Sequence, residues 1–192
     1  MDDSPTRHAN SKVAKDDWTM AALEVIATEG PSGLKIELLA KRLRITKGSF
    51  YWHFRDRQHL IETALELWYR LATADVIERL NRIEDPEQRL RALFAESFGD
   101  VVNGPIDALL LGQVDDPVVG PVVIRATTAR LAFLSRTYRD LGLPHGQALA
   151  RARLAYGAYI GVAHLRRIPG SAPSTARDQS AFERQLELLL MR

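Results

Sequence analysis

The 192-residue chain contains no cysteine, and no apolar run in it is long enough to span a membrane. The absence of cysteine excludes disulfide bonds, thiolate metal sites and cysteine nucleophiles. A membrane-spanning helix needs roughly 20 apolar residues, and the N-terminal segment also lacks the apolar core of a secretory signal. We therefore expect a cytoplasmic protein that has no membrane partner.

The motifs by which many enzymes are recognised are also missing. No GxSxG, no HExxH and no phosphate-cradling glycine loop occurs, and the five histidines show no metal-ligand spacing. Asp115 and Asp116 stand at an expected helix start, where N-capping explains them better than catalysis does. We therefore expect no catalytic residue, no cofactor and no metal ion, and hence a protein that is not an enzyme.

No segment alternates apolar and polar residues as strands do, so we predict an all-α fold. The N-terminal residues 1–11 show no hydrophobic periodicity. We interpret them as a mobile arm, and an arm that contacts DNA is the alternative. Helices are predicted, with approximate ends, over residues 13–29, 36–43, 47–52, 57–82, 86–103, 106–111, 121–141, 144–167 and 177–191.

The stretch from residue 36 to residue 54 organises the rest of the chain. Starting from Ile36, apolar residues recur at i, i+3, i+4 and i+7, which is one face of a helix. Thr46 can N-cap a second, short helix. Two helices joined by so tight a turn form a helix-turn-helix, whose second helix enters the major groove of double-stranded DNA.

The second of these helices is polar over most of its surface and therefore needs a polar partner. Lys47 is the best candidate for reading bases, because lysine can donate to guanine O6 and N7, and Gly48 allows close approach to the groove. For the two large aromatic residues, internal packing is the alternative to DNA contact. The DNA-binding residues predicted in this segment are Thr46, Lys47, Gly48, Ser49, Tyr51, Trp52 and His53.

Positive charge is concentrated in the same region. The net charge of the whole chain is only +2, yet residues 33–57 contain seven basic and two acidic residues. Residues 61–192 contain 16 of each and are neutral overall. A phosphate-binding surface requires such a local excess, although a solvated basic face would have the same composition.

The run ITKGSFYWHFRDRQHLI, residues 45–61, resembles the recognition helix of the tetracycline-repressor (TetR) family of bacterial transcriptional regulators. The resemblance extends from Trp18 to Trp68, and KGSFYWHF is its most specific part. Family members usually carry glycine where this chain has Arg44, and serine or threonine near the start of the preceding helix. If the turn requires a positive φ at Arg44, a residue other than glycine costs about 1 kcal/mol there.

This resemblance implies a helix-turn-helix DNA-binding domain, residues 1–56, and a helical ligand-binding and dimerisation domain, residues 57–192. Arg57 matches a family position that binds phosphate. The helix predicted from Arg57 to about Arg82 would be roughly 39 Å long at 1.5 Å per residue. It is too long for the N-terminal module alone, so we expect it to join the two domains.

The resemblance also implies a small-molecule pocket in the second domain, with the long helix as one wall. We predict that Trp68, Phe98 and Tyr156 line this pocket, although their spacing is equally that of core residues. His164 is a candidate polar contact, and a position on the helix surface is the alternative.

The resemblance further implies that the last two helices form a four-helix bundle with the same helices of a second copy. The interface residues that we predict are Gly157, Gly161, Phe182, Leu186 and Leu190, the glycines because they allow helices to pack closely.

Together these features predict a ligand-responsive transcriptional regulator. We expect a repressor that binds an inverted-repeat operator as a homodimer and releases it when a small-molecule effector binds; activation is the alternative. A purely architectural DNA-binding protein is the competing class. It would account for the N-terminal module but would leave the neutral C-terminal part without a function.

Overall fold

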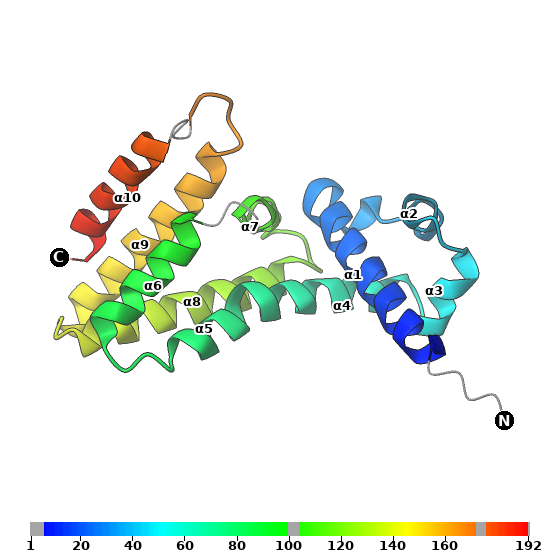
Figure 1. Ribbon diagram of the computed structural model, residues 1–192, viewed down its shortest axis with the longest axis horizontal. Coiled ribbons are helices and arrows are strands. Elements are labelled where there is room, and N and C mark those ends of the chain that lie inside the picture. Colours follow the sequence, from blue (N-terminus) through cyan, green and yellow to red (C-terminus); the bar gives the residue numbers. More distant parts are fainter. Residues whose placement is uncertain (1–5, 100–103, 172–175, 192) are drawn as a thin grey trace.

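The computed structural model describes residues 6–99, 104–171 and 176–191, and within these ranges the chain is helical with no strand (Figure 1). The predicted all-α fold, with an N-terminal helix-turn-helix and a helical C-terminal body, is confirmed. No helix in the described part is long and apolar enough to cross a membrane. The helices are α1 (Thr6–Gly33), α2 (Ile36–Leu43), α3 (Lys47–His53), α4 (Arg57–Tyr69), the π-helical turn η1 (Arg70–Ala74), α5 (Asp75–Leu80), α6 (Pro86–Gly99), α7 (Gly104–Leu111), α8 (Gly120–Asp140), α9 (His145–Leu165) and α10 (Ala176–Leu190).

The molecule is elongated, with α1, α2 and α3 at one end and α9 and α10 at the other (Figure 1). Helices α4, α5 and α8 run lengthwise between the two ends. A single path of helix, α4–η1–α5, therefore leads from the helix-turn-helix into the C-terminal body.

Three aromatic residues hold the helix-turn-helix together. Trp18 of α1 is fully buried and lies edge-on to Phe50 of α3, with ring centroids 5.4 Å apart. Phe50 stacks on Phe54, also at 5.4 Å, and both rings are buried. Burial of such a side chain contributes about 1.5–3 kcal/mol. The short helix α3 is thus anchored to α1 by its apolar side.

Helix α1 begins at Thr6 rather than at Val13, so the predicted arm over residues 1–11 is wrong in length. Residues 1–5, and the side chains of Arg7 and Lys12, lie outside the described residues. The C-terminal end of α1 agrees with the end that we predicted from the sequence. Gly30 has φ 75° and ψ 172°, a backbone conformation that glycine adopts readily, and it breaks the helix before Pro31.

Arg44 ends α2 in the left-handed conformation, with φ 56° and ψ 36°. It is the one non-glycine residue with a positive φ in the described part of the chain. Its N–H donates to the carbonyl oxygen of Lys41 at 3.2 Å, which closes the turn. The helix-turn-helix therefore keeps its tight turn at the expense of roughly 1 kcal/mol or more of backbone strain.

The predicted uninterrupted helix from Arg57 to about Arg82 is only partly correct. Its start agrees, because the Asp56 carboxylate accepts the N–H of His59 at 2.8 Å as an N-cap. Its middle, from Arg70 to Ala74, is π-helical, and α5 ends at Leu80. Propensity and period do not reveal a π-helical turn, because it depends on side chains from elsewhere that bond the released backbone groups.

Helix α6 begins at Pro86, as we predicted. The Asp85 carboxylate accepts the N–H of Glu87 at 3.0 Å, which caps the helix. The described part of the helix reaches Gly99, and α7 begins at Gly104. Residues 100–103, the last part of the predicted range 86–103, lie outside the described residues.

The rest of the C-terminal body agrees closely with the predicted helix ends. Gly142, with φ 93°, follows α8 as the expected C-terminal glycine. Helices α9 and α10 lie side by side (Figure 1), and Arg151 of α9 donates to the carbonyl oxygen of Leu189 at 2.9 Å. Tyr138 of α8 donates to the carbonyl oxygen of Leu190 at 2.8 Å, so the end of α10 is tied to the body.

Two apolar cores lie along the molecule. One contains Trp18 and Phe50 and continues into Leu110 of α7 and Val123 of α8. The other is built around Phe94, Phe133 and other side chains of α5, α6, α8, α9 and α10. The first core crosses residue 56, so the domain boundary that we predict there is not a break in packing.

Candidate nucleic-acid interface and ligand cavity

Helix α3 turns a polar and aromatic face to solvent. Trp52 is 83% exposed and Tyr51 is 58% exposed, while Phe50, which directly precedes them, is buried. Thr46 N-caps the helix by accepting the N–H of Ser49 at 3.3 Å, and the Ser49 hydroxyl donates to the Thr46 carbonyl at 2.7 Å. The start of α3 is thus fixed by its own side chains.

Lys47 and Glu37 form an exposed ion pair across the turn, with Nζ 2.6 Å from Oε1. Their hydrogen bond, helped by the opposite charges, raises the pKa of Lys47 and lowers that of Glu37. Exposed ion pairs contribute little to stability and are readily exchanged for another partner. The ammonium group of Lys47 is therefore held near the helix N-terminus, and it can leave Glu37 to bind another acceptor.

Gly48 is exposed, and a Cβ built on it would meet only the Thr46 hydroxyl, at 3.9 Å. Nothing in the folded chain requires glycine at this position. His53 is half-buried and lies edge-on to Phe54, with centroids 6.3 Å apart, so it packs at the end of α3.

Arg57 does not present a free guanidinium. Its Nε donates to the carbonyl oxygen of Leu34 at 2.7 Å, and its Nη2 donates to that of Pro31. The Pro31 carbonyl oxygen also accepts the N–H of Leu34 at 3.2 Å, and Arg57 ties α4 to this turn after α1. In this arrangement the side chain holds the turn after α1, and the phosphate contact expected for Arg57 stays a prediction.

A cavity of about 150 Å³ lies in the C-terminal body, where η1 and α5 face α6, α8 and α9. Phe98 and Tyr156 line it, as we predicted, and Trp68 does not. Most other lining residues are apolar. The full lining consists of Leu71, Ala72, Thr73, Val76, Ile77, Arg79, Leu80, Leu93, Phe94, Glu96, Ser97, Phe98, Arg130, Phe133, Leu134, Ala155, Tyr156 and Tyr159.

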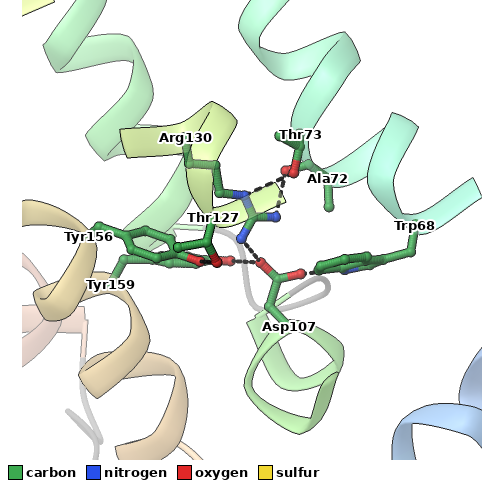
Figure 2. A network of polar contacts seen from close by, with 8 residues as sticks. All are labelled: Trp68, Ala72, Thr73, Asp107, Thr127, Arg130, Tyr156 and Tyr159. Carbon is green, nitrogen blue, oxygen red and sulfur yellow. Dashed lines mark hydrogen bonds and ion pairs between the residues drawn. The ribbon is translucent and has the colours of Figure 1, made fainter. Parts of the chain in front are cut away.

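A buried carboxylate, Asp107 of α7, gathers side chains from three other helices beside this cavity (Figure 2). Asp107 is 1% exposed. Its Oδ1 accepts from Trp68 Nε1 at 2.6 Å, and its Oδ2 accepts from Arg130 Nη1 at 2.7 Å and from the Tyr159 hydroxyl at 2.8 Å. The carboxylate is thus paired and hydrogen-bonded on both oxygens, as a buried charge must be.

Arg130 of α8 uses all three of its nitrogens. Besides the bond to Asp107, its Nε donates to the Thr73 hydroxyl at 2.9 Å and its Nη2 to the Ala72 carbonyl at 2.9 Å. Both acceptors lie in η1, where the π-helical turn changes the helical hydrogen-bond register (Figure 2). Arg130 therefore holds the irregular turn of the long helix at the cavity wall.

The charge of this cluster is internally balanced. Burial by itself lowers the pKa of Arg130, but the charge of Asp107, its hydrogen bond and the nearby tyrosines together outweigh burial, and the pKa is raised. Burial, reinforced by the negative charge of Asp107, raises the pKa of Tyr159 well above its usual value. Arg130 stays charged and the Tyr159 hydroxyl keeps its proton, so both continue to donate to Asp107.

Neither Asp107 nor Arg130 was among the residues predicted from the sequence. The available signal was an acidic residue within the apolar run IDALLL, residues 106–111, because a buried carboxylate is rare unless it is paired. Its partner stands 23 positions away, at no recognisable spacing. His164 is exposed, which agrees with the surface alternative.

The residues predicted for the dimer interface fall into two groups. Gly157 and Gly161 are exposed on α9, and nothing lies within 4 Å of a Cβ built on either. Leu186 and Leu190 are 8% and 5% exposed and pack in the core of their own chain, with Phe182 half-buried beside them. Leu186 and Leu190 thus face the core of their own chain, and the interface that we predict at these residues stays a prediction.

Comparison with known proteins supports the DNA-binding module and the overall fold. The family model for bacterial regulatory proteins of the tetR family matches residues 19–64, which include α2, α3 and parts of α1 and α4. No curated protein matches the sequence.

Several solved structures share the fold over nearly their whole length. A TetR-family transcriptional regulator from Agrobacterium tumefaciens has a TM-score of 0.72 and 21% identity, covering 93% of this chain and 98% of that one. Escherichia coli NemR in its reduced form has a TM-score of 0.69 and 16% identity, with 92% and 96% covered. The fatty acid degradation regulator FadR from Bacillus halodurans has a TM-score of 0.65 and 14% identity, with 100% and 97% covered.

At these identities the structural similarities establish the fold, and the family model identifies the DNA-binding part. Residues 19–64 thus carry the N-terminal helix-turn-helix domain of the TetR family, and the chain as a whole has the fold of TetR-family transcriptional regulators.

Proposed function

We propose that this chain is a one-component repressor that binds an inverted-repeat operator through α3 and releases it when a small molecule enters the cavity. The observation that carries the proposal is the exposed face of α3, with Trp52 83% and Tyr51 58% exposed. Adjacent large aromatic residues on a surface indicate a partner. Beside Lys47 and the hydroxyls of Thr46 and Ser49, they fit sugars, thymine methyl groups and phosphates.

Lys47 is the proposed base-reading residue. The exposed bond to Glu37 keeps its ammonium group at the N-terminal end of α3, where a recognition helix contacts base edges. Gly48 supports close approach to DNA, because the chain's own packing leaves space for a larger residue there. Tyr51 and His53 are proposed as phosphate contacts.

The proposed homodimer uses the exposed faces of α9 and α10. Leu154 and Leu165 are 65% and 45% exposed, and they share a stripe of α9 with Gly157 and Gly161. Leu189 of α10 is 69% exposed. A contiguous apolar stripe at the end of the molecule far from α3 suits a symmetric contact that leaves both recognition helices free (Figure 1).

The proposed response to a ligand follows the long helix. The α4–η1–α5 path begins beside the helix-turn-helix at Arg57 and forms one cavity wall through Leu71, Ala72 and Thr73. A ligand shifts a conformational equilibrium only if it binds one arrangement better than the other. A ligand that favours a different position of η1 would move α4 and, with it, the spacing of the paired recognition helices.

An architectural DNA-binding protein remains the competing class, and the cavity favours a regulator over it. Since the proposed partner is bacterial operator DNA, the proposed location is the cytoplasm.

Selection of bound DNA from a random pool is the test. The expected site is an inverted repeat with half-site centres about 34–36 Å apart or a multiple of that distance. Enrichment of a single asymmetric half-site, bound by one copy, would contradict the proposal. Ligand and operator should then weaken each other's binding by the same factor, because the coupling is reciprocal.

A further inference from the structure

The walls of the cavity are suited to an apolar ring. The side chains of Phe94, Phe98 and Phe133 contribute aromatic surface, and Leu80 and Leu134 contribute aliphatic surface. A dry apolar cavity of the same order of size, about 150 Å³, can hold a benzene molecule. The size and lining therefore correspond to one aromatic ring with small substituents.

The charges at the cavity wall leave none for a ligand. Arg130 is one of two cations in the cavity wall, and its charge is compensated by buried Asp107 at 2.7 Å. The other charged pair in the wall, Arg79 and Glu96, is joined by its own ion pair. A ligand carboxylate beside Arg130 would be desolvated and would also lie close to the Asp107 charge. Such a group is costly to bury without a free partner.

Hydroxyl groups in the wall can still serve a ligand, that of Ser97 and that of Tyr156. The Tyr156 hydroxyl lies 3.2 Å from the Thr127 hydroxyl, and either can be the donor (Figure 2). Because each hydroxyl can both donate and accept, this pair can turn to meet either a hydroxyl or a carbonyl group. The wall thus offers adaptable hydroxyl groups and no unpaired charge.

We propose that the effector is an uncharged, single-ring aromatic molecule that carries one hydroxyl or carbonyl group near Tyr156. This inference rests on the proposed ligand-responsive function and adds the chemical class of the ligand. It excludes carboxylic acids that are ionised at neutral pH, because Arg130, the buried cation of the cavity wall, is already paired with Asp107.

A matched series of three compounds tests the charge requirement by calorimetry on the full chain at pH 7. The compounds are p-cresol, 4-methylacetophenone and 4-methylbenzoate, of which the last two have nearly the same size and differ in charge. We expect both neutral compounds to bind, with 4-methylacetophenone at least about tenfold tighter than 4-methylbenzoate. Equal or tighter binding of the carboxylate, or no binding of either neutral compound, would overturn the proposal.

Two variants of α9 test whether binding occurs in this cavity. Ala155 is buried in the cavity wall, whereas Ala150 is exposed on the same helix. Ala155→Ile should fill part of the space and weaken p-cresol binding at least about tenfold, and Ala150→Ile should leave it unchanged. Equal binding by the two variants would place the compound elsewhere and refute the assignment.

A third variant tests the charge argument by reversing the selectivity. Asp107→Asn removes the negative charge with little change in shape and leaves Arg130 as an uncompensated cation. This variant should bind 4-methylbenzoate at least about tenfold more tightly than the wild type does. Unchanged carboxylate affinity in a folded variant would show that Asp107 does not set the selectivity. If the variant does not fold, the wild-type series still tests the ligand class and the α9 variants still test the binding site.

Binding and regulation are separated by repeating the titration with operator DNA selected from a random pool. Binding of p-cresol without release of DNA would uphold the ligand class and refute the proposed response. Release of DNA by a carboxylate that occupies the same cavity would uphold the response and refute the ligand class.

Discussion

The side-chain amide of Gln113 donates to the carbonyl oxygen of Ala27 at 2.9 Å. The same nitrogen donates to the carbonyl oxygen of Ile26, also at 2.9 Å. In a continuous helix the carbonyl of Ala27 would accept the N–H of residue 31, which is Pro31 and has none. Gln113 follows α7, the helix that carries Asp107, so one short segment connects the cavity cluster with the end of α1.

Gln113→Ala tests this contact. The variant leaves the Ala27 carbonyl without its side-chain donor, and we expect the free energy of unfolding to fall by about 1–2 kcal/mol. Urea denaturation measures the change, with the exposed Gln88→Ala as the matched control. If Gln113 also transmits the ligand signal, the variant should bind ligand normally but lose part of the effect of the ligand on DNA affinity.

Arg44→Gly should stabilise the protein. Arg44 has φ 56°, which glycine adopts without strain, so we expect the free energy of unfolding to rise by about 1 kcal/mol. Lys41→Gly, inside α2, is the control and should lower it by a similar amount, because glycine is unfavourable within a helix. A loss of stability in Arg44→Gly would mean that contacts of the arginine side chain outweigh the strain.

Lys47→Ala and Tyr51→Phe separate sequence reading from general affinity. We expect Lys47→Ala to weaken operator binding by about 1–3 kcal/mol and to relax preference at one or two base pairs. Tyr51→Phe removes a proposed phosphate contact and should weaken binding to all sequences similarly. Competition between the selected site and its single-base variants measures both effects. An unchanged base preference in Lys47→Ala would refute the role assigned to Lys47.

Tyr138 makes stability depend on alkaline pH. Burial raises the pKa of Tyr138 to about 12, above its value of 10.0 in the unfolded chain. Its stabilising contribution is complete below pH 10 and is lost as the pH rises toward 12, by roughly 2 kcal/mol. Unfolding measured from pH 8 to 12 should show this fall, and Tyr138→Phe should show less of it. Tyr51→Phe, at an exposed ring, should follow the wild-type curve.

Leu154→Glu and Leu189→Glu test the proposed dimer surface. Each change places a carboxylate on an exposed apolar position of α9 or α10, and symmetry brings two copies of it to the interface. We expect a change from dimer to monomer in light scattering after size-exclusion chromatography. Ile124→Glu, at a 56% exposed residue of α8, is the control and should remain dimeric. A wild-type protein that is monomeric at micromolar concentration would contradict the dimer.

Much of this molecule could be predicted from the sequence, because the relevant interactions are local. Thr46 caps α3 three residues away, Gly30 ends α1 through its own backbone, and the apolar period from Ile36 forms one helical face. The same locality makes the exposed polar face of α3 predictable, since Phe50 alone must turn inward. Residues that are neighbours in the chain constrain one another whatever the rest of the fold does.

The remaining features depend on the tertiary structure. Arg130 holds η1 through the carbonyl of Ala72, 58 positions away, and Gln113 reaches Ala27 across 86 positions. Arg57 resembles a phosphate ligand in sequence, yet it donates to the carbonyl oxygens of Leu34 and Pro31, 23 and 26 positions away. Leu186 and Leu190 form an apolar stripe of α10. The helical periodicity does not show which surface this stripe packs against, and in the fold it packs in the core of its own chain. An unsatisfied carbonyl, a buried charge or an apolar face states only that a partner is needed, and the packing of distant helices determines which residue provides it.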